Sequence, residues 1–221
     1  MKPSILKLLF MFFIVVLIGA AVKIGATTPF FSDTETSTNN ALSVADSFGP
    51  PIANHLVINE VYYDPDSSHK HPASADERDF EWIEIYNPTG SIVNLKNWKI
   101  VDNSATERSI STSNRDLGPG EFAILAKAAN VFTLWSIPTS AIKIPIGERF
   151  GNGLANDGDR VILKDPNGTI IDQMSYGTDT TVLNPTVPGI AEGHSLERDP
   201  DGVDTDTAAD FVDRSLPTPG L

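Results

Sequence analysis

The sequence predicts an all-β fold, an antiparallel β-sandwich of about seven to nine strands in two sheets. Residues 56–63 and 81–88 are rich in β-branched and aromatic side chains, as strands are. Asp-Pro-Asn-Gly at residues 165–168 separates two apolar runs, and Asn-Gly is a strong hairpin signal because it accepts positive φ. The 3.6-residue apolar repeat of a helix is missing between ordinary caps, and only residues 126–134 could form a short helical turn.

The strands follow one another at short intervals. Within residues 81–88 the side chains of Trp82 and Glu84 should point to one side, and those of Ile83 and Ile85 to the other. Residues 95–102 and 122–125 read as further strands, the latter after a Gly-Pro-Gly turn. We expect a core of Ile58, Trp82, Ile85, Leu95, Trp98, Ile100, Phe122, Ile124, Val161, Leu163, Ile170 and Met174. With no cysteine to link the sheets, the two tryptophans of this set should hold them together.

The order of these pieces resembles that of a known family. The runs INEV, EWIEIYNP, NLKNWKIVD, LGPGEFAIL and LANDGDRVILKDPNGTIIDQMSYG follow one another as in the lamin tail domain family. The resemblance covers roughly residues 52–177 and implies an immunoglobulin-like β-sandwich, which we expect over residues 52–179. It also implies a non-enzymatic module. Eukaryotic members bind nucleic acid and chromatin, and bacterial relatives are appended to secreted nucleases and hydrolases.

Charge argues against carrying nucleic-acid binding over to this chain. Its 221 residues include 29 acidic and 16 basic residues, a formal net charge of −13. Lys2, Lys7 and Lys23 are the charged residues of the first 26, so without that segment 13 basic residues face 29 acidic ones, a net charge of −16. Nucleic-acid binding depends on Lys and Arg that neutralise phosphates, so we expect no nucleic-acid partner.

The N-terminal end reads as an export segment. Residues 1–26 combine two early lysines, an apolar stretch at residues 8–22 and the small residues Gly25 and Ala26. They predict a signal peptide or, as the alternative, a retained membrane anchor. The folded part should then be extracellular, secreted or tethered to the outer face of the cytoplasmic membrane. Residues 27–51 read as a polar linker.

One part of that linker has a second interpretation. Residues 30–40, FFSDTETSTNN, are similar to the start of the mature region in exported proteins of the camelysin and TasA type. If the segment is not a plain linker, it could add a strand to a neighbouring molecule. The protein would then be a structural subunit of a surface fibre, assembled by strand exchange.

Residues 180–221 predict an acidic extension that packs on the sandwich or trails from it. Dense carboxylates suit Ca²⁺, which takes six to eight oxygen ligands. The EF-hand spacing is not met, because Gly202 and Val203 stand where ligands should, and a solvated acidic loop is the alternative. We predict no other cofactor. The candidate ligands are Asp199, Asp201, Asp204, Asp206 and Asp210.

Other polar groups give weaker indications. His69 and His71, with carboxylates at residues 64–79, could bind a transition metal, although a hydrated insertion explains them as well. Glu60 and Glu84 should lie on adjacent strands, where they could cap a loop or pair with a basic residue such as Lys99 or Arg160. Ser195 beside His194 lacks a nucleophile elbow.

The absence of a recognisable catalytic set predicts a non-enzymatic, exported domain that binds or associates at a surface. Its partner would be an extracellular protein or polysaccharide. The alternatives are the fibre subunit and an accessory module of a secreted hydrolase system. Self-association belongs to the first of these, and membrane contact would come only through an uncleaved N-terminal segment.

Overall fold

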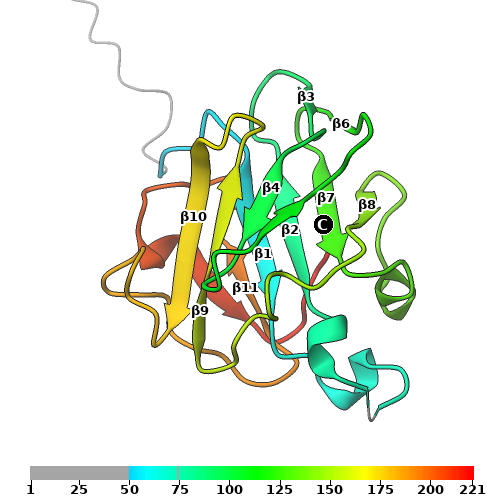
Figure 1. The fold of residues 1–221 in the computed structure, drawn as a ribbon. Coiled ribbons are helices and arrows are strands. Elements are labelled where there is room, and N and C mark those ends of the chain that lie inside the picture. Colours follow the sequence, from blue (N-terminus) through cyan, green and yellow to red (C-terminus); the bar gives the residue numbers. More distant parts are fainter. Residues whose placement is uncertain (1–49, 74) are drawn as a thin grey trace, which may run out of the picture. The chain divides into compact units, whose positions relative to one another are not determined.

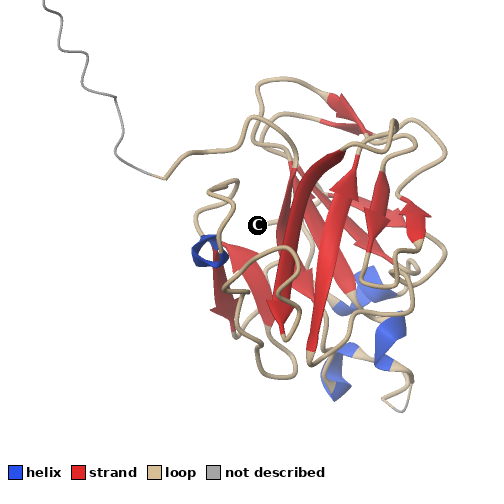
Figure 2. Ribbon diagram, turned by 60° about the vertical axis from the view of Figure 1, so that its left-hand side comes forward, coloured by secondary structure: helices blue, strands red, loops and turns tan. Residues whose placement is uncertain are grey.

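A sandwich of two sheets, with a two-stranded ribbon beside it, forms the protein in its computed structural model (Figures 1 and 2). The structure describes residues 50–73 and 75–221, so the predicted export segment and most of the predicted linker lie outside the described residues. The six-stranded sheet has the order β12-β11-β1-β2-β7-β8. Its strands are β1 (Val57–Tyr62), β2 (Trp82–Tyr86), β7 (Phe122–Ala126), β8 (Ile142–Pro145), β11 (Ser195–Arg198) and β12 (Phe211–Arg214).

The four-stranded sheet has the order β10-β9-β4-β5. Its strands are β4 (Lys99–Val101), β5 (Glu107–Ser109), β9 (Gly158–Lys164) and β10 (Ile170–Gly177), and the ribbon is β3 (Val93–Asn94) with β6 (Asp116–Leu117). Four short 3-10 helices complete the described elements. They are η1 (Ser67–His69), η2 (Glu77–Asp79), η3 (Val131–Leu134) and η4 (Ala208–Asp210).

The all-β prediction is confirmed, but the strand number and the purely antiparallel pairing are wrong. The described part has twelve strands, and β8 runs parallel to β7. The reason is the connection between them. Residues 127–141, which include η3, carry the chain back along the sheet before β8 begins, so β8 runs in the direction of β7. The predicted helical turn at residues 126–134 is therefore only the 3-10 turn η3.

The β9–β10 hairpin confirms the Asn-Gly prediction. Gly168 has φ of +87°, a conformation that favours glycine, and its N–H donates to the carbonyl of Asp165 at 3.0 Å. The side chain of Asp165 accepts the N–H groups of Asn167 and Thr169 at 2.9 and 2.8 Å, which fixes the turn. Ile170, the first residue of β10, is 48% exposed, so its assignment to the core is wrong; it stands directly after this surface turn.

Two apolar clusters lie on opposite faces of the six-stranded sheet. Ile83 and Ile85 belong to the cluster between the sheets, with Trp98 from the other sheet, whereas Trp82 belongs to the second cluster. This confirms the alternation predicted for residues 81–88. The prediction that Trp82 holds the two sheets together is therefore wrong. Trp82 packs on the other face of the six-stranded sheet, beneath the segments that hold η2 and η3. Phe122 is only partly buried against that second cluster.

The C-terminal region is part of the sandwich. β11 and β12 extend the six-stranded sheet beyond β1, so the boundary drawn at residue 179 does not separate two units. β12 lies outside β11 and forms this edge of the sheet. Among the helices of residues 50–73 and 75–221, none has the length and apolar character to cross a membrane.

Candidate functional site

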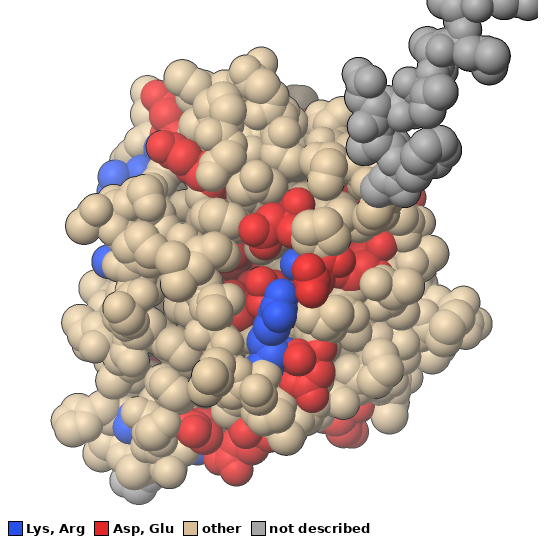
Figure 3. All heavy atoms as spheres, turned by 180° about the vertical axis from the view of Figure 1, so that it is seen from behind, with Lys and Arg blue, Asp and Glu red and all other residues tan. Residues whose placement is uncertain are grey.

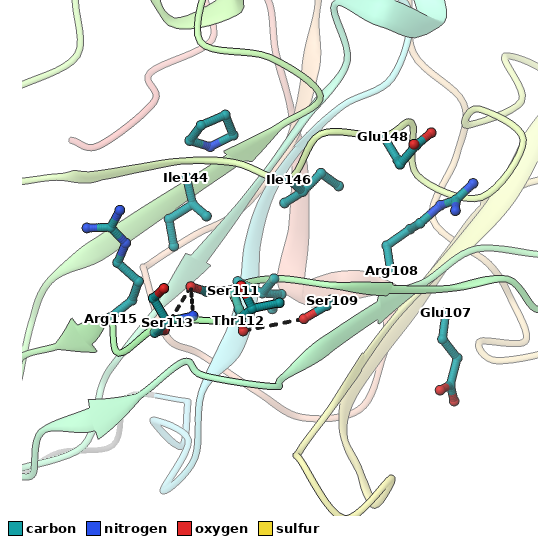
Figure 4. Close-up of a pocket in the computed structure, with 12 residues that line it drawn as sticks. Glu107, Arg108, Ser109, Ser111, Thr112, Ser113, Arg115, Ile144, Ile146 and Glu148 are labelled. Carbon is teal, nitrogen blue, oxygen red and sulfur yellow. Dashed lines mark hydrogen bonds between the residues drawn. The ribbon is translucent and has the colours of Figure 1, made fainter.

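A groove opens between the free edges of the two sheets. β5 ends the four-stranded sheet and β8 ends the six-stranded sheet, and the hollow beside them has a volume of about 440 Å³ (Figure 4). Two loops complete its walls, one after β5 and one after β8. It is lined by Glu107, Arg108, Ser109, Ile110, Ser111, Thr112, Ser113, Arg115, Ile144, Pro145, Ile146 and Glu148.

Hydroxyl groups form one wall of this groove. The segment after β5 folds on itself, because Ser111 Oγ donates to the carbonyl of Ser113 at 2.8 Å and accepts the N–H of Ser113 at 3.1 Å. Ile146 is half-buried and supplies apolar surface, while Ile110 and Ile144 are buried in the floor of the groove. The groove thus combines apolar contact surface with a row of short hydrogen-bonding side chains.

The charged residues of the groove differ in how firmly they are held. The Arg108 guanidinium donates to the carbonyls of Arg149 and Gly151 at 3.0 and 3.1 Å, so it is a fixed part of the wall. Arg115 and Glu148 are exposed and form no ion pair within the described residues, and Figure 4 shows them at opposite ends of the group. Arg115 thus stands at one end of the groove, and Glu148 lies beside Arg108 at the other.

The aspartates proposed as calcium ligands are divided among protein partners. Asp204 and Asp210 each accept from Nη1 of the buried Arg198 at 3.3 Å. The same guanidinium pairs with Asp172 of β10, from Nη2, at 3.0 and 3.1 Å. Arg198 is only 2% exposed. Two of the five acids thus serve a buried ion cluster, which ties the C-terminal segment to the opposite sheet.

The remaining acids of the run lie apart from that cluster. Asp199 pairs with Arg214 at 3.3 Å, Asp201 accepts from Asn59 Nδ2 at 2.9 Å, and Asp206 is exposed. Within residues 50–73 and 75–221, no group of three or more histidines and acids is placed to hold a metal ion.

Calcium binding by this run stays a prediction. An ion at Asp204 would have to compete with Arg198 and with His55, whose Nε2 lies 3.3 Å from the same carboxylate. The hydrogen bond that His55 donates to the Asp204 carboxylate raises the pKa of His55 to about 9. Millimolar Ca²⁺ should raise the unfolding temperature if the run binds it, and Asp201→Ala with Asp204→Ala should abolish the rise. Equal unfolding temperatures with and without Ca²⁺ would contradict the prediction.

The loop between β1 and β2 is fixed by ion pairs and ring stacking. His69 Nδ1 lies 2.8 Å from the Asp66 carboxylate, and its ring stacks on Trp135 at a centroid distance of 3.9 Å. Arg149 donates to Asp79 at 2.6 Å, and this bond lowers the pKa of that carboxyl. His71 is exposed and stands apart from these contacts. The loop is therefore more firmly packed than the hydrated insertion expected from sequence.

Glu60 and Glu84 are register partners on β1 and β2, as predicted, but the suggested basic partners are wrong. Lys99 pairs with Glu107, and Arg160 pairs with Asp179. Both glutamates instead accept main-chain N–H groups, from Thr218 at 3.1 Å and Gly220 at 2.6 Å.

Neighbouring Ser195 and His194 bond to different partners. Ser195 Oγ donates to Glu60, and His194 Nδ1 lies 2.7 Å from Asp213.

Sequence reasoning missed the groove. Its signal in the sequence is the run RSISTSNR at residues 108–115, where four hydroxyl residues stand between two arginines. Nothing in that run shows that residues 144–148 form the opposite wall, because only the topology of the two sheets brings them together.

Comparison with known proteins adds the family. A search of curated protein sequences found no match. Among solved structures, a DUF4876 family protein from Bacteroides thetaiotaomicron is similar in fold, with 11% sequence identity, coverage of 75% of this chain and 72% of that chain, and a TM-score of 0.48. The family described as Lamin Tail Domain matches residues 50–178, more than half of the sequence. That match agrees with the predicted resemblance and fits a non-enzymatic domain. The chain belongs to the lamin tail domain family.

Proposed function

We propose that this lamin tail domain is a binding module that acts outside the cytoplasm, and that the groove between β5 and β8 takes an extended segment of another polypeptide. The single observation that carries the proposal is the groove itself: an open hollow with apolar surface, a hydroxyl wall and the exposed charges of Arg115 and Glu148, which have opposite signs. The location outside the cytoplasm rests on the export segment expected at residues 1–26.

The lining chemistry favours a peptide over other ligands. The half-buried Ile146 can contact an apolar side chain, while the hydroxyl groups can bond to a peptide main chain. None of the described residues that line the groove is aromatic, so they offer no platform on which a base or a sugar ring would stack. A segment with an acidic residue at one end and a basic residue at the other would complement Arg115 and Glu148.

β8, the edge strand of the six-stranded sheet beside the groove, is poorly suited to pair with an added strand. The partner should therefore be recognised mainly through side chains. β8 carries Lys143 and ends in Pro145, which has no N–H to give to a neighbouring strand. Lysine and proline are common means of preventing edge-to-edge pairing. The hollow and its charges, more than the open main chain, should therefore select the partner.

A peptide-display screen on the immobilised protein tests the proposal. We expect selected sequences to share an apolar centre with opposite charges on its two sides. Arg115→Glu should weaken binding of such a peptide at least about tenfold, which is about 1.4 kcal/mol. A peptide with its acidic residue changed to lysine should recover affinity for that variant.

The control variant is Lys96→Glu, which makes the same charge change at an exposed lysine outside the groove lining. Double-stranded DNA and soluble wall polysaccharide serve as comparison ligands, and the acidic chain should not bind the DNA at physiological salt. Equal loss of peptide binding in Arg115→Glu and Lys96→Glu would refute the groove as the site. Binding of polysaccharide instead of peptide would refute the ligand class.

A further inference from the structure

Three glutamates stand side by side across the six-stranded sheet. Glu197 of β11 is the register partner of Glu60 on β1, and Glu60 is the partner of Glu84 on β2. Register partners point to the same face, and here they share the face of Trp82, away from the second sheet. Their exposed fractions are only 6%, 1% and 1%. Like charges directly opposite one another are destabilising, so this row needs a structural explanation.

A short segment covers the row. We call residues 215–221 the C-terminal strap, because they follow β12 and run over the glutamates. The N–H of Thr218 donates to Glu60 and the N–H of Gly220 donates to Glu84, while Thr218 Oγ1 donates to Glu197 at 3.4 Å. Each carboxylate of the row therefore holds one atom of the strap.

The strap fits closely at its far end. Gly220 has φ of +90°, and a Cβ at this position would lie 2.8 Å from the Cβ of Ala141, in the segment before β8. Glycine is the residue that accepts both the backbone conformation and the short approach. Leu216 and Leu221, by contrast, are 80% and 64% exposed. The strap is thus held in place by its main-chain contacts to the glutamates and by the fit of Gly220. Its own leucines bury little apolar surface.

The charges around the row are not balanced. On β12, Arg214 Nε donates to Glu197 at 2.5 Å, and Arg214 Nη2 also pairs with Asp199. Asp201 adds a further carboxylate, through Asn59, which donates both to it and to Glu84. Lys143 of β8 donates to the carbonyl of Ile137 and is exposed. β7 and the strap bring no charged side chain. Figure 3 shows a face of the molecule on which Asp and Glu side chains surround a small patch of Lys or Arg.

Burial makes these carboxyl groups hold protons more strongly. It raises the pKa of Glu60 from 4.5 to about 7, raises that of Glu84 well above its usual value, and raises that of Glu197. The N–H groups of Thr218 and Gly220 lower the pKa values of Glu60 and Glu84, but burial is the larger effect, so a carboxyl uncovered by the strap would return toward 4.5. The covered state thus binds more protons between these values, so a rise in pH through about 4.5 to 7 must weaken the covered state relative to the open one.

We propose that residues 215–221 are a proton-controlled strap, which is seated on the glutamate row under mildly acidic conditions and lifts as the row ionises. Lifting uncovers an acidic strip across β11, β1 and β2 without unfolding the sandwich, because the sheet hydrogen bonds and the cluster between the sheets do not depend on the strap.

A spin label on the strap tests this. The chain has no cysteine, so Leu221→Cys gives a single labelling site at an exposed position near the far end. We expect an immobilised spectrum of the nitroxide at pH 5 and a growing mobile fraction as pH rises to 9. The constant for seating the strap should fall by up to about tenfold per pH unit for each titrating carboxyl. Far-ultraviolet circular dichroism should stay unchanged over the same range.

The matched variants are Glu60→Gln and Glu84→Gln, made singly, with Glu192→Gln at an exposed position as the control. A glutamine still accepts the strap's N–H but carries no charge, so each row variant should shift the release to higher pH or remove it, whereas Glu192→Gln should not. Thermal unfolding at pH 5 identifies a variant that fails to fold, in which case the other row variant decides. A nitroxide spectrum that is constant from pH 5 to 9 in the labelled parent, or identical release in all variants, would overturn the proposal.

Discussion

Arg198→Met should lower the free energy of unfolding by about 3–5 kcal/mol, as expected when one partner of a buried ion cluster is removed. The guanidinium is surrounded by acceptors: Nε donates to the carbonyl of Ile58 at 2.9 Å, Nη1 to the carbonyl of Val203 at 2.6 Å, and Nη2 to the carboxylate of Asp172. It also lies 4.6 Å from the ring centre of Phe211. Methionine fills similar space but leaves these groups without a donor.

The loss should depend on pH in a defined direction. Burial already raises the pKa of Asp172, and the Arg198 charge opposes that rise. Without the arginine the folded state holds its proton to still higher pH, so the stability of the variant should fall further as pH rises above the ordinary value of 3.8. Denaturant unfolding at pH 5 and pH 8 measures both effects.

Two further variants make this prediction specific. Adding Asp172→Asn to Arg198→Met should recover part of the loss, because it removes the unpaired charge. Lys96→Met, the same substitution type at an exposed lysine, should change stability by less than about 0.5 kcal/mol. A loss below about 1 kcal/mol in Arg198→Met would show that the cluster is not needed for stability.

Trp82→Ala should also cost about 3–5 kcal/mol, the range for a large-to-small change of a buried aromatic residue. Trp82 is fully buried and stacks on Tyr62, with ring centres 5.6 Å apart and planes at 16°. Trp135 meets it edge to face at 5.5 Å. The substitution would leave a cavity on the outer face of the six-stranded sheet, beneath the segments that hold η2 and η3.

The position of that cavity distinguishes Trp82 from Trp98, which belongs to the cluster between the sheets. We expect Trp82→Ala to increase amide exchange mainly in residues 67–80 and 131–141, while β9 and β10 keep most of their protection. Trp82→Phe should cost less, since the ring remains. Equal loss of protection in β9, β10 and residues 67–80 would contradict this prediction, because it would show that Trp82 stabilises the packing of the two sheets on each other.

The sequence predicts local features well and partners across the sheets poorly. Alternation in residues 81–88 correctly separates Trp82 from Ile83, but both faces of this strand are buried, so the period of two cannot tell which face meets the second sheet. The β9–β10 hairpin is predictable because the residues that make the turn are contiguous. The lamin tail resemblance is predictable for a similar reason, since it rests on the order of short motifs.

Longer-range chemistry was not predictable from such patterns. The aspartates after Arg198 looked like a hydrated or calcium-binding run, because nothing in the sequence shows that this arginine is buried and is shared with Asp172 of the other sheet. The groove likewise depends on two sheet edges that are about 35 residues apart in the chain and carry no shared motif. Charged residues in strands are assigned to the surface by default, and for Glu60 and Glu84 that default fails.

The place of β1 in the sheet has a consequence for how the chain folds. This first strand lies between β2, which follows it closely, and β11, which begins at Ser195. Arg198 reaches Ile58 across 140 positions of the sequence. Contacts of such wide separation require a large loop to close before any stabilisation is gained, which makes folding slow, on the order of milliseconds to seconds for small β proteins. A growing chain therefore keeps one side of β1 unpaired until residues 195–198 have been made, and during that interval the strand is open to pairing with other chains.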